Sequence, residues 1–226
     1  STPCAFTVRR DSGITLVTDL KGKKVMAINP ASPAFTRSAD MTLEAVGMGR
    51  KDITALQFTD FAEASQALQG GRISGFIHPY PAIGIAPALQ EFNASVPARL
   101  IAAPWDKLEP LLPKYPYFSK AVLTAKDHGE ITNDKDLITI GFKDLVVSRT
   151  DIPDDLVFEV MKAIFDHLNE IYAYHPVIKS WTDNPLASPI VPFHPGAIKY
   201  YKEKGLWTNE LENKQKKLLA EVGASR

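Results

Sequence analysis

Residues 24–77 decide the fold, and they read KVMAINPASPAFTRSADMTLEAVGMGRKDITALQFTDFAEASQALQGGRISGFI. Three apolar runs in this stretch have the length and composition of strands: 24–28, 53–58 and 73–77. A helical stretch after the first run extends to about Gly47, and Asp60 opens a second helix that ends at Gly70 and Gly71. Strands separated by helices predict parallel pairing with helices on both faces of a sheet. The fold class predicted from these residues is therefore α/β.

The same alternation continues beyond residue 77. The turn His78–Pro81 leads to a helix that ends near Phe92. Two further apolar runs are predicted strands: 99–103 and 121–125. After a polar loop at 127–136, residues 137–147 contain two apolar runs. We interpret this segment as one long strand, or as two collinear ones, that leaves the first unit.

The C-terminal third of the chain is predicted to be helical. Asp154 and Asp155 follow Pro153, and carboxylates are favoured at the positive end of a helix dipole. From Leu156 to Tyr172 the apolar residues recur at helical spacing, which indicates an amphipathic helix that covers a sheet. Two more helices are expected, one near 195–204 and one from about 209. Because no strand follows in this part, we expect the covering sheet to come from residues before Ser1 or from another chain.

Composition excludes some classes of function. The chain has 226 residues, of which 45% are hydrophobic, and its 26 Lys and Arg residues balance 26 Asp and Glu residues. This length suits two small domains, and the zero net charge argues against nucleic acid as the partner. No apolar run approaches the roughly 20 residues that span a bilayer. Residues 1–4 do not resemble a signal peptide, so we expect any export signal to be missing from this chain. Cys4 is the single cysteine and forms no internal disulfide.

Several segments carry a resemblance to a known family. Residues 193–206, FHPGAIKYYKEKGL, are similar to the C-terminal signature of TAXI solute receptors, the binding components of TRAP transporters. Other segments agree with that family in order and spacing: Val8–Ile14 with Asp19–Val25, Phe61–Phe76, Tyr115–Ser119, and Leu145–Val157. Together these segments extend over nearly the whole chain.

The resemblance implies a type II periplasmic-binding-protein fold, in which two lobes joined by hinge strands enclose a ligand cleft. Residues 1–20 would be the crossover strand, 21–138 the second lobe, and 139–226 the return strand and helices of the first lobe. That lobe would be incomplete, because family members carry a further N-terminal region. Either the chain is a truncated form, or a partner chain supplies this region.

The resemblance also implies the function. Such a receptor is periplasmic, binds a small solute that is expected to be anionic, such as a carboxylate or an amino acid, and delivers it to a TRAP-type membrane transporter subunit. It would need no cofactor and would catalyse no reaction. A sensory or regulatory binding module and an enzyme on the same fold are the alternatives.

The candidate ligand-binding residues follow the predicted strands, because ligands of open α/β sheets lie beyond the carboxyl ends of the strands. Three loops supply them: Asn29, Ser32 and Thr36; Thr59 and Phe61; His78 and Tyr80. Pro33 stands where the family has a glycine in a turn that resembles a carboxylate cradle, and it removes a backbone donor. The alternative for Ser32 or Thr36 is only to cap the helix that follows, and Asp60 is expected to be an N-cap.

The predicted hinge adds three further candidates: Arg10, Phe142 and Lys143. Either cation would suit a carboxylate, although both are residue types typical of the surface. Catalytic motifs are lacking, and His78 with Asp60 is the one pair that an enzyme could use. His167 and His175 are interpreted as surface and capping residues, and His128 among acidic residues is only a weak indication of a metal site.

Overall fold

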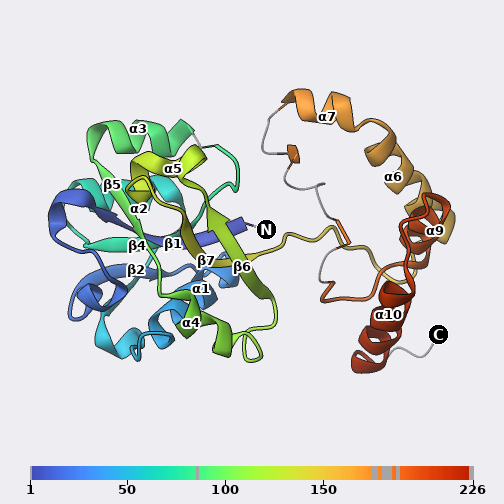
Figure 1. Ribbon diagram of the computed structural model, residues 1–226, viewed down its shortest axis with the longest axis horizontal. Helices are drawn as coiled ribbons and strands as arrows, with labels where there is room; N and C mark the ends of the chain where they lie inside the picture. The colour runs from blue at the N-terminus through green and yellow to red at the C-terminus, as the bar shows by residue number, and fades with distance from the viewer. Residues whose placement is uncertain (1, 85–86, 175–177, 180–184, 187–188, 224–226) are drawn as a thin grey trace. The chain divides into compact units, whose positions relative to one another are not determined.

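The computed structural model describes residues 2–84, 87–174, 178–179, 185–186 and 189–223. The chain forms two compact units, Ser1–Asp144 and Leu145–Arg226 (Figure 1). The first unit is a mixed sheet with helices, and the second is built from helices in its described residues.

Seven strands form the sheet of the first unit: β1 (Thr2–Arg9), β2 (Lys24–Ile28), β3 (Thr54–Gln57), β4 (Gly75–Pro79), β5 (Ala98–Ile101), β6 (Phe118–Leu123) and β7 (Leu137–Phe142). The strand order is β3-β2-β4-β1-β7-β6, and β5 also pairs with β1. β2 is parallel to β3 and β4, which confirms the prediction for residues 24–77. The remaining pairs are antiparallel. Parallel pairing is therefore wrong for residues 98–101, because their neighbour is the N-terminal strand running the opposite way.

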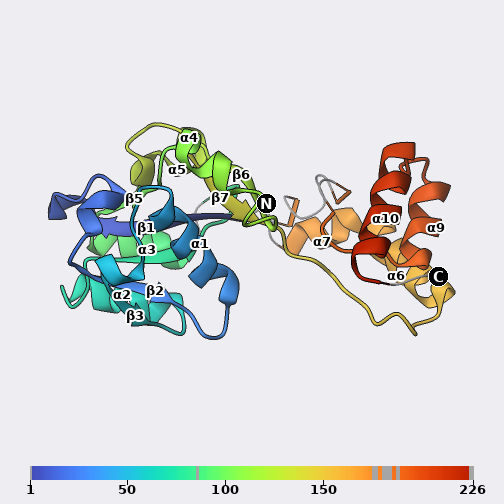
Figure 2. The same ribbon diagram turned by 90° about the horizontal axis from the view of Figure 1, so that it is seen from below.

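Five helices belong to this unit: α1 (Pro33–Glu44), α2 (Phe61–Gln69), α3 (Pro87–Ser95), α4 (Trp105–Leu108) and α5 (Ala125–Thr132). α1 connects β2 to β3, and α2 connects β3 to β4, which lies on the other side of β2. Because such crossovers are right-handed, the two helices cover opposite faces. Figures 1 and 2 show the sheet between α1 and α4 on one face and α3 and α5 on the other.

Local signals define these helices. The carboxylate of Asp60 accepts a hydrogen bond from the Glu63 N–H at 2.9 Å, which confirms its prediction as N-cap of α2. The Glu63 carboxylate in turn accepts from the Thr59 N–H and hydroxyl group. After α1, Gly47 takes a φ of 73°, a left-handed conformation that favours glycine at the end of a helix.

The core of the first unit lies on both faces of the sheet. Its largest fully buried side chains include Phe6, Phe58 and Phe76. Cys4 is buried in the same sheet, and burial raises the pKa of its thiol to about 12. The Cys4 side chain is therefore an inert core residue at neutral pH, since the thiolate is the reactive form.

Two predictions for residues 121–147 are wrong. The segment 127–136 is not a loop throughout, because α5 begins at Ala125, with Thr124 accepting from the Asp127 N–H as its N-cap. The predicted long strand 137–147 ends at Phe142. At this end Phe142 pairs with Thr2 of β1 and with Phe118 of β6. The described residues place no strand beside the chain after Phe142, and Val146 is 96% exposed.

The second unit contains four helices that the structure describes: α6 (Asp154–Asp166), α7 (Leu168–Tyr174), α9 (Pro195–Glu203) and α10 (Asn209–Glu221). The predicted helix over 154–172 is broken at His167, whose φ of −114° is not helical. No strand occurs among this unit's described residues, and none of the residues of α6 is fully buried. The described residues of this unit therefore supply no strand for α6 to cover, and the origin of a covering sheet stays a prediction.

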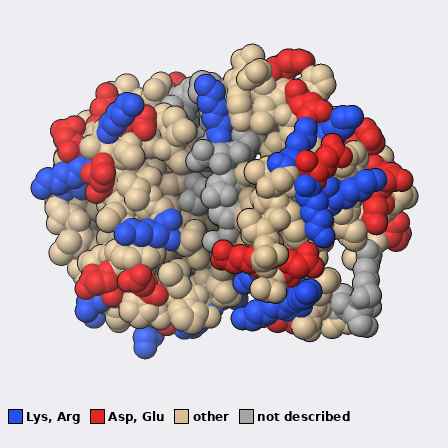
Figure 3. Space-filling model, turned by 45° about the vertical axis from the view of Figure 1, so that its right-hand side comes forward, with Lys and Arg blue, Asp and Glu red and all other residues tan. Residues whose placement is uncertain are grey.

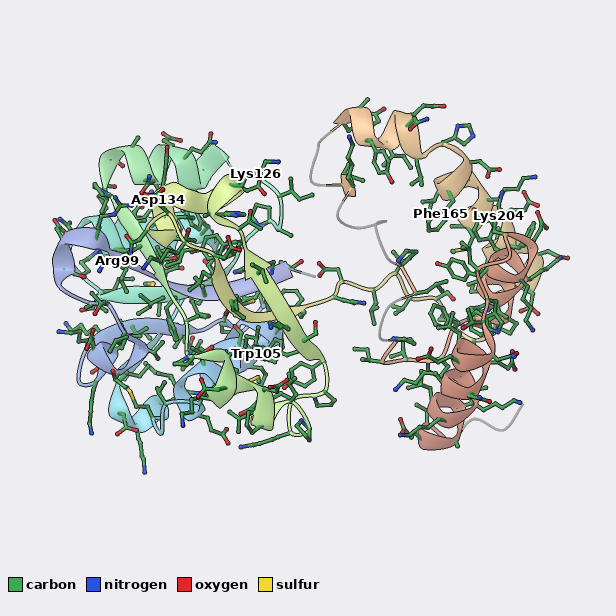
Figure 4. The ribbon with its side chains drawn as sticks, in the orientation of Figure 1. Arg99, Trp105, Lys126, Asp134, Phe165 and Lys204 are labelled. Atoms are coloured by element: carbon green, nitrogen blue, oxygen red, sulfur yellow. The ribbon has the colours of Figure 1, made fainter. Side chains whose placement is uncertain are left out.

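α6 packs against α9 through aromatic rings. The rings of Phe165 and Tyr200 stack with centroids 5.5 Å apart, and the Lys204 ammonium group lies 3.3 Å from the Asp166 carboxylate. Figure 4 shows Phe165 and Lys204 side by side at this contact. The other side of α6 leaves Leu156 and Val160 exposed.

Gly196 permits the closest approach of these two helices. A Cβ atom at this position would lie 2.9 Å from the Cβ of Val157, and it would overlap the carbonyl oxygen of Asp154. His194 caps α9 by accepting a hydrogen bond from the Gly196 N–H at its Nδ1, and its Nε2 lies 3.1 Å from the Ile152 carbonyl oxygen. The sequence His194-Pro195-Gly196 thus fixes the start of α9 against the start of α6.

Candidate ligand-binding site

One edge of the sheet brings most of the predicted site residues together. β2, β3 and β4 are parallel, so their carboxyl ends lie at the same edge, where α1 and α2 begin. The register of the antiparallel strands brings two more segments to this edge, since Cys4 pairs with Pro79 and Thr2 pairs with Phe142. Loops from four strands therefore converge where open α/β sheets bind ligands.

Asn29 holds the first of these loops in place. Its side chain is 2% exposed, accepts a hydrogen bond from the Ser32 N–H at 2.9 Å, and donates one to the Thr59 carbonyl oxygen at 3.1 Å. The Thr36 hydroxyl accepts from the Asn29 N–H and donates to the Asn29 carbonyl oxygen. Ser32 precedes α1 without a side-chain capping bond. Asn29 and Thr36 thus position the loop, while the Ser32 hydroxyl makes no capping bond to this helix.

Half-buried rings lie at the same edge, and we call them the aromatic patch: Phe35, Phe61, His78 and Phe142. The His78 ring centroid is 4.9 Å from that of Phe61 and 5.8 Å from that of Phe35. Phe35 is also 6.2 Å from Phe142. Four different elements, α1, α2, β4 and β7, therefore contribute one ring each to a continuous partly exposed surface.

Burial keeps His78 neutral. Desolvation lowers the pKa of this imidazole from 6.5 to about 4, which outweighs a backbone hydrogen bond that raises it. Its Nδ1 is buried and has no hydrogen-bond partner among the described residues. At neutral pH the ring therefore offers one donor and one acceptor and carries no charge.

We expect His78 to make stability depend on pH between about 4 and 6.5. The unfolded chain binds a proton at pH 6.5 and below, whereas the folded chain resists it until about pH 4. Stability is therefore highest above pH 6.5 and falls as the pH is lowered, by up to about 3 kcal/mol. Urea unfolding at several pH values, with His78→Gln beside the wild type, measures this slope. His167→Gln is the control, because the hydrogen bond with Glu170 raises the pKa of His167, so its removal should not reduce the slope; an equal slope in His78→Gln and wild type would contradict the assignment.

Tyr80 lies beneath the site rather than on its surface. It is 2% exposed, and its hydroxyl group forms a hydrogen bond with the Thr7 hydroxyl within the sheet. Its N–H donates to the Pro3 carbonyl oxygen at 2.7 Å. The structure therefore gives Tyr80 a part in holding β4 to β1.

The predicted cations lie in different places. Arg10 follows the other end of β1, where its guanidinium group donates to the Glu130 carbonyl oxygen, so it does not join the other candidates. Lys143 directly follows Phe142 at the edge of the site and is half-buried, and desolvation lowers the pKa of its ammonium group. Lys143 is therefore the predicted cation that the fold brings to this edge.

Phe35 belongs to the aromatic patch but is not among the residues selected from the sequence. It lies in the first turn of α1, inside the segment 29–36 that supplies Asn29, Ser32 and Thr36 as candidates. Its position in the sequence is a signal for this place. Phe35 lies one turn before the buried Ala39, and therefore on the same face of α1, at the end of the helix that follows β2. The pair proposed for catalysis is not joined, because no hydrogen bond or ion pair links Asp60 to His78, both of which are described.

The histidines outside the aromatic patch do not gather into a metal site where the structure describes them. Among the described residues there is no group of three or more His, Cys, Asp or Glu side chains placed to hold a metal ion. His128 is buried, with its Nε2 3.0 Å from the Pro81 carbonyl oxygen. His167 is exposed, 2.8 Å from Glu170, and His175 lies outside the described residues.

The surface and the helices give two further observations. On the face seen in Figure 3, basic and acidic side chains are interspersed, in keeping with the zero net charge. The described helices include none with both the length and the apolar character needed to cross a bilayer.

Several solved structures are similar to this chain at low identity. The periplasmic aliphatic sulphonate binding protein SsuA from Escherichia coli is 21% identical, with a TM-score of 0.38 over 50% of this chain and 36% of that one. The L-cystine solute receptor of Neisseria gonorrhoeae is 14% identical, with a TM-score of 0.31 over 47% of this chain and 39% of that one. A sulfonate-binding protein from Methylobacillus flagellatus KT is 13% identical, with a TM-score of 0.43 over 99% of this chain and 67% of that one.

The chain covers little more than a third of the length of the first two of these proteins. A match to a protein family extends much further, from residue 1 to residue 205. It includes the whole sheet with its candidate site and the start of α9 with His194 and Gly196. By this match the chain belongs to the NMT1-like family.

Proposed function

We propose that the chain is part of an extracytoplasmic, periplasmic solute receptor that binds a small anionic solute and delivers it to a TRAP-type membrane transporter. The observation that carries this proposal is the convergence of loops from β2, β3, β4 and β7 at one edge of the sheet. Ligand sites of α/β folds lie at such edges, where the first turns of helices present free N–H groups. The resemblance to TAXI receptors supplies the transporter type and the periplasmic location.

A carboxylate would be held by groups of this edge. The first turns of α1 and α2 offer backbone donors, and Lys143 offers a positive charge. The Thr59 hydroxyl is exposed beside them, although it donates to the Glu63 carboxylate in this structure. Pro33 removes one donor from the first turn of α1, so more of the anion's binding would fall to Lys143.

The rest of the receptor would complete the first lobe. In this proposal residues 1–20 are the crossover strand of the hinge, residues 21–138 form the second lobe, and residues 139–226 are the return strand and helices of the first lobe. An N-terminal region, in the same polypeptide or in a partner chain, would supply that lobe's sheet. The incomplete burial of α6 supports this arrangement, because its exposed Leu156 and Val160 are the kind of residues that pack on a sheet.

The test is stabilisation of the full-length protein by carboxylates and amino acids in thermal unfolding. A solute at about 100 times its Kd adds about 2.7 kcal/mol to the stability of the receptor. We expect Lys143→Met to weaken binding of the solute that stabilises the wild type. Lys120→Met is the matched control, because Lys120 is exposed on β6 and lies over the Trp105 ring. Failure of every carboxylate and amino acid to stabilise the protein would overturn the proposal.

A further inference from the structure

The aromatic patch has a feature that a simple carboxylate would not use. Its rings, Phe35, Phe61, His78 and Phe142, are all half-buried, so each presents part of its surface at the edge of the sheet. Fully buried rings would serve only the core, and the same region has such rings in Phe76 and Phe92. Two of the partly exposed rings contact these core residues: Phe61 meets Phe76 and Phe92, and His78 meets Phe76.

Three neighbouring rings hold the Phe61 side chain in place. Its ring makes edge-to-face contacts with Phe76, at 5.7 Å and 77°, and with Phe92, at 6.2 Å and 86°. It meets His78 at 4.9 Å and 66°. A ring fixed on three sides loses little conformational freedom when a ligand packs on it, and such preorganisation increases affinity.

The patch is also uncharged. The His78 imidazole is neutral at pH 7 and the other members are phenylalanines, so a carboxylate placed directly on these rings would lose hydration without a partner. A flat apolar ring has no charge whose hydration could be lost. Ring pairs in offset or edge-to-face contact are stabilised by about 0.5–1.5 kcal/mol beyond the contribution of the area that they bury.

From this geometry we infer that the solute carries an aromatic ring, which packs on the aromatic patch while its single carboxylate lies toward Lys143. This inference rests on the proposed function and adds the class of solute, an aromatic carboxylate. His78 contributes an edge contact to the ring and one hydrogen bond to a polar substituent on it.

A matched series of solutes tests this inference with the full-length protein. Isothermal titration would compare benzoate and phenylacetate, which have a ring and one carboxylate, with propionate and succinate, which have no ring. We expect the ring compounds to bind at least about tenfold more tightly. Phe61→Leu keeps an apolar side chain but removes the ring, and it should reduce this preference about fivefold or more.

The control variant is Phe165→Leu, which removes a ring from the α6–α9 contact and should leave the preference as in the wild type. If succinate or propionate bound as tightly as benzoate, the inference would be overturned while the proposed function stood. A ring preference that persisted in Phe61→Leu would overturn the assignment to the aromatic patch. If no carboxylate of either kind bound, the proposed function itself would fail.

Discussion

Gly196→Ala is expected to disrupt the packing of α6 against α9. The added Cβ would overlap the Asp154 carbonyl oxygen and press on Val157, both in the first turn of α6. Backbone atoms cannot move aside as the end of a flexible side chain can, so the two helices must separate. Overpacking of this kind costs about 3 kcal/mol, which is a large part of the stability of a small helical unit. Native-state hydrogen exchange should show the amides of α6 and α9 losing protection.

Gly49→Ala makes the same chemical change where there is room for it. A Cβ at Gly49 would meet nothing within 4 Å, and the φ of −150° there is accessible to any residue. This variant should unfold within about 0.5 kcal/mol of the wild type. Unchanged protection of α6 and α9 in Gly196→Ala would show that the helices do not depend on this close approach.

Phe6→Ala should destabilise the first unit by about 3–5 kcal/mol, the range for removing a buried ring. Phe6 is fully buried in β1, where it pairs with Ile77 on one side and Ile101 on the other. The lost ring would leave a cavity in the middle of the sheet, and strands fixed by hydrogen bonds on both sides cannot collapse to fill it. Denaturant unfolding followed by far-ultraviolet circular dichroism measures the change.

Val122→Ala is the comparison for Phe6→Ala. Val122 is partly exposed on β6, at the end of the strand order, so its truncation leaves no closed cavity and should cost about 0.5 kcal/mol. Equal losses in the two variants would mean that β1 is not the centre of the core.

The local elements of residues 24–77 could be predicted because their signals are local. Asp60 and Glu63 lie three residues apart and form the hydrogen bonds that start α2, and Gly47 ends the turn after α1. The partners of β1 could not be predicted in this way. Its hydrogen bonds join it to three strands distant in sequence, and no pattern within residues 2–9 specifies them. For the same reason the length of β7 could not be predicted, because its hydrogen-bond partners, β1 and β6, lie outside the segment itself.

The position of the candidate residues could be predicted in part. The rule that ligands lie beyond the carboxyl ends of strands selects Asn29, Thr59 and His78, and they lie at one edge of the sheet because the rule depends only on strand direction. Arg10 is also a candidate because it flanks β1. It follows the end of β1 that lies away from the site, and the sequence alone does not show which end of that strand faces the site. Tyr80 shows a second limit, since the hydroxyl that it meets belongs to Thr7, a residue 73 positions earlier.

The pairing of β1 with β7 has a consequence for the synthesis of the protein. β1 cannot complete its hydrogen bonds until residue 142 has followed it out of the ribosome, because Thr2 pairs with Phe142. Until then the nascent chain exposes the apolar residues and open edge of β1, which is a state prone to aggregation. Pairing over such a separation also makes refolding slow, since the entropy of closing a long loop is lost before the contacts form.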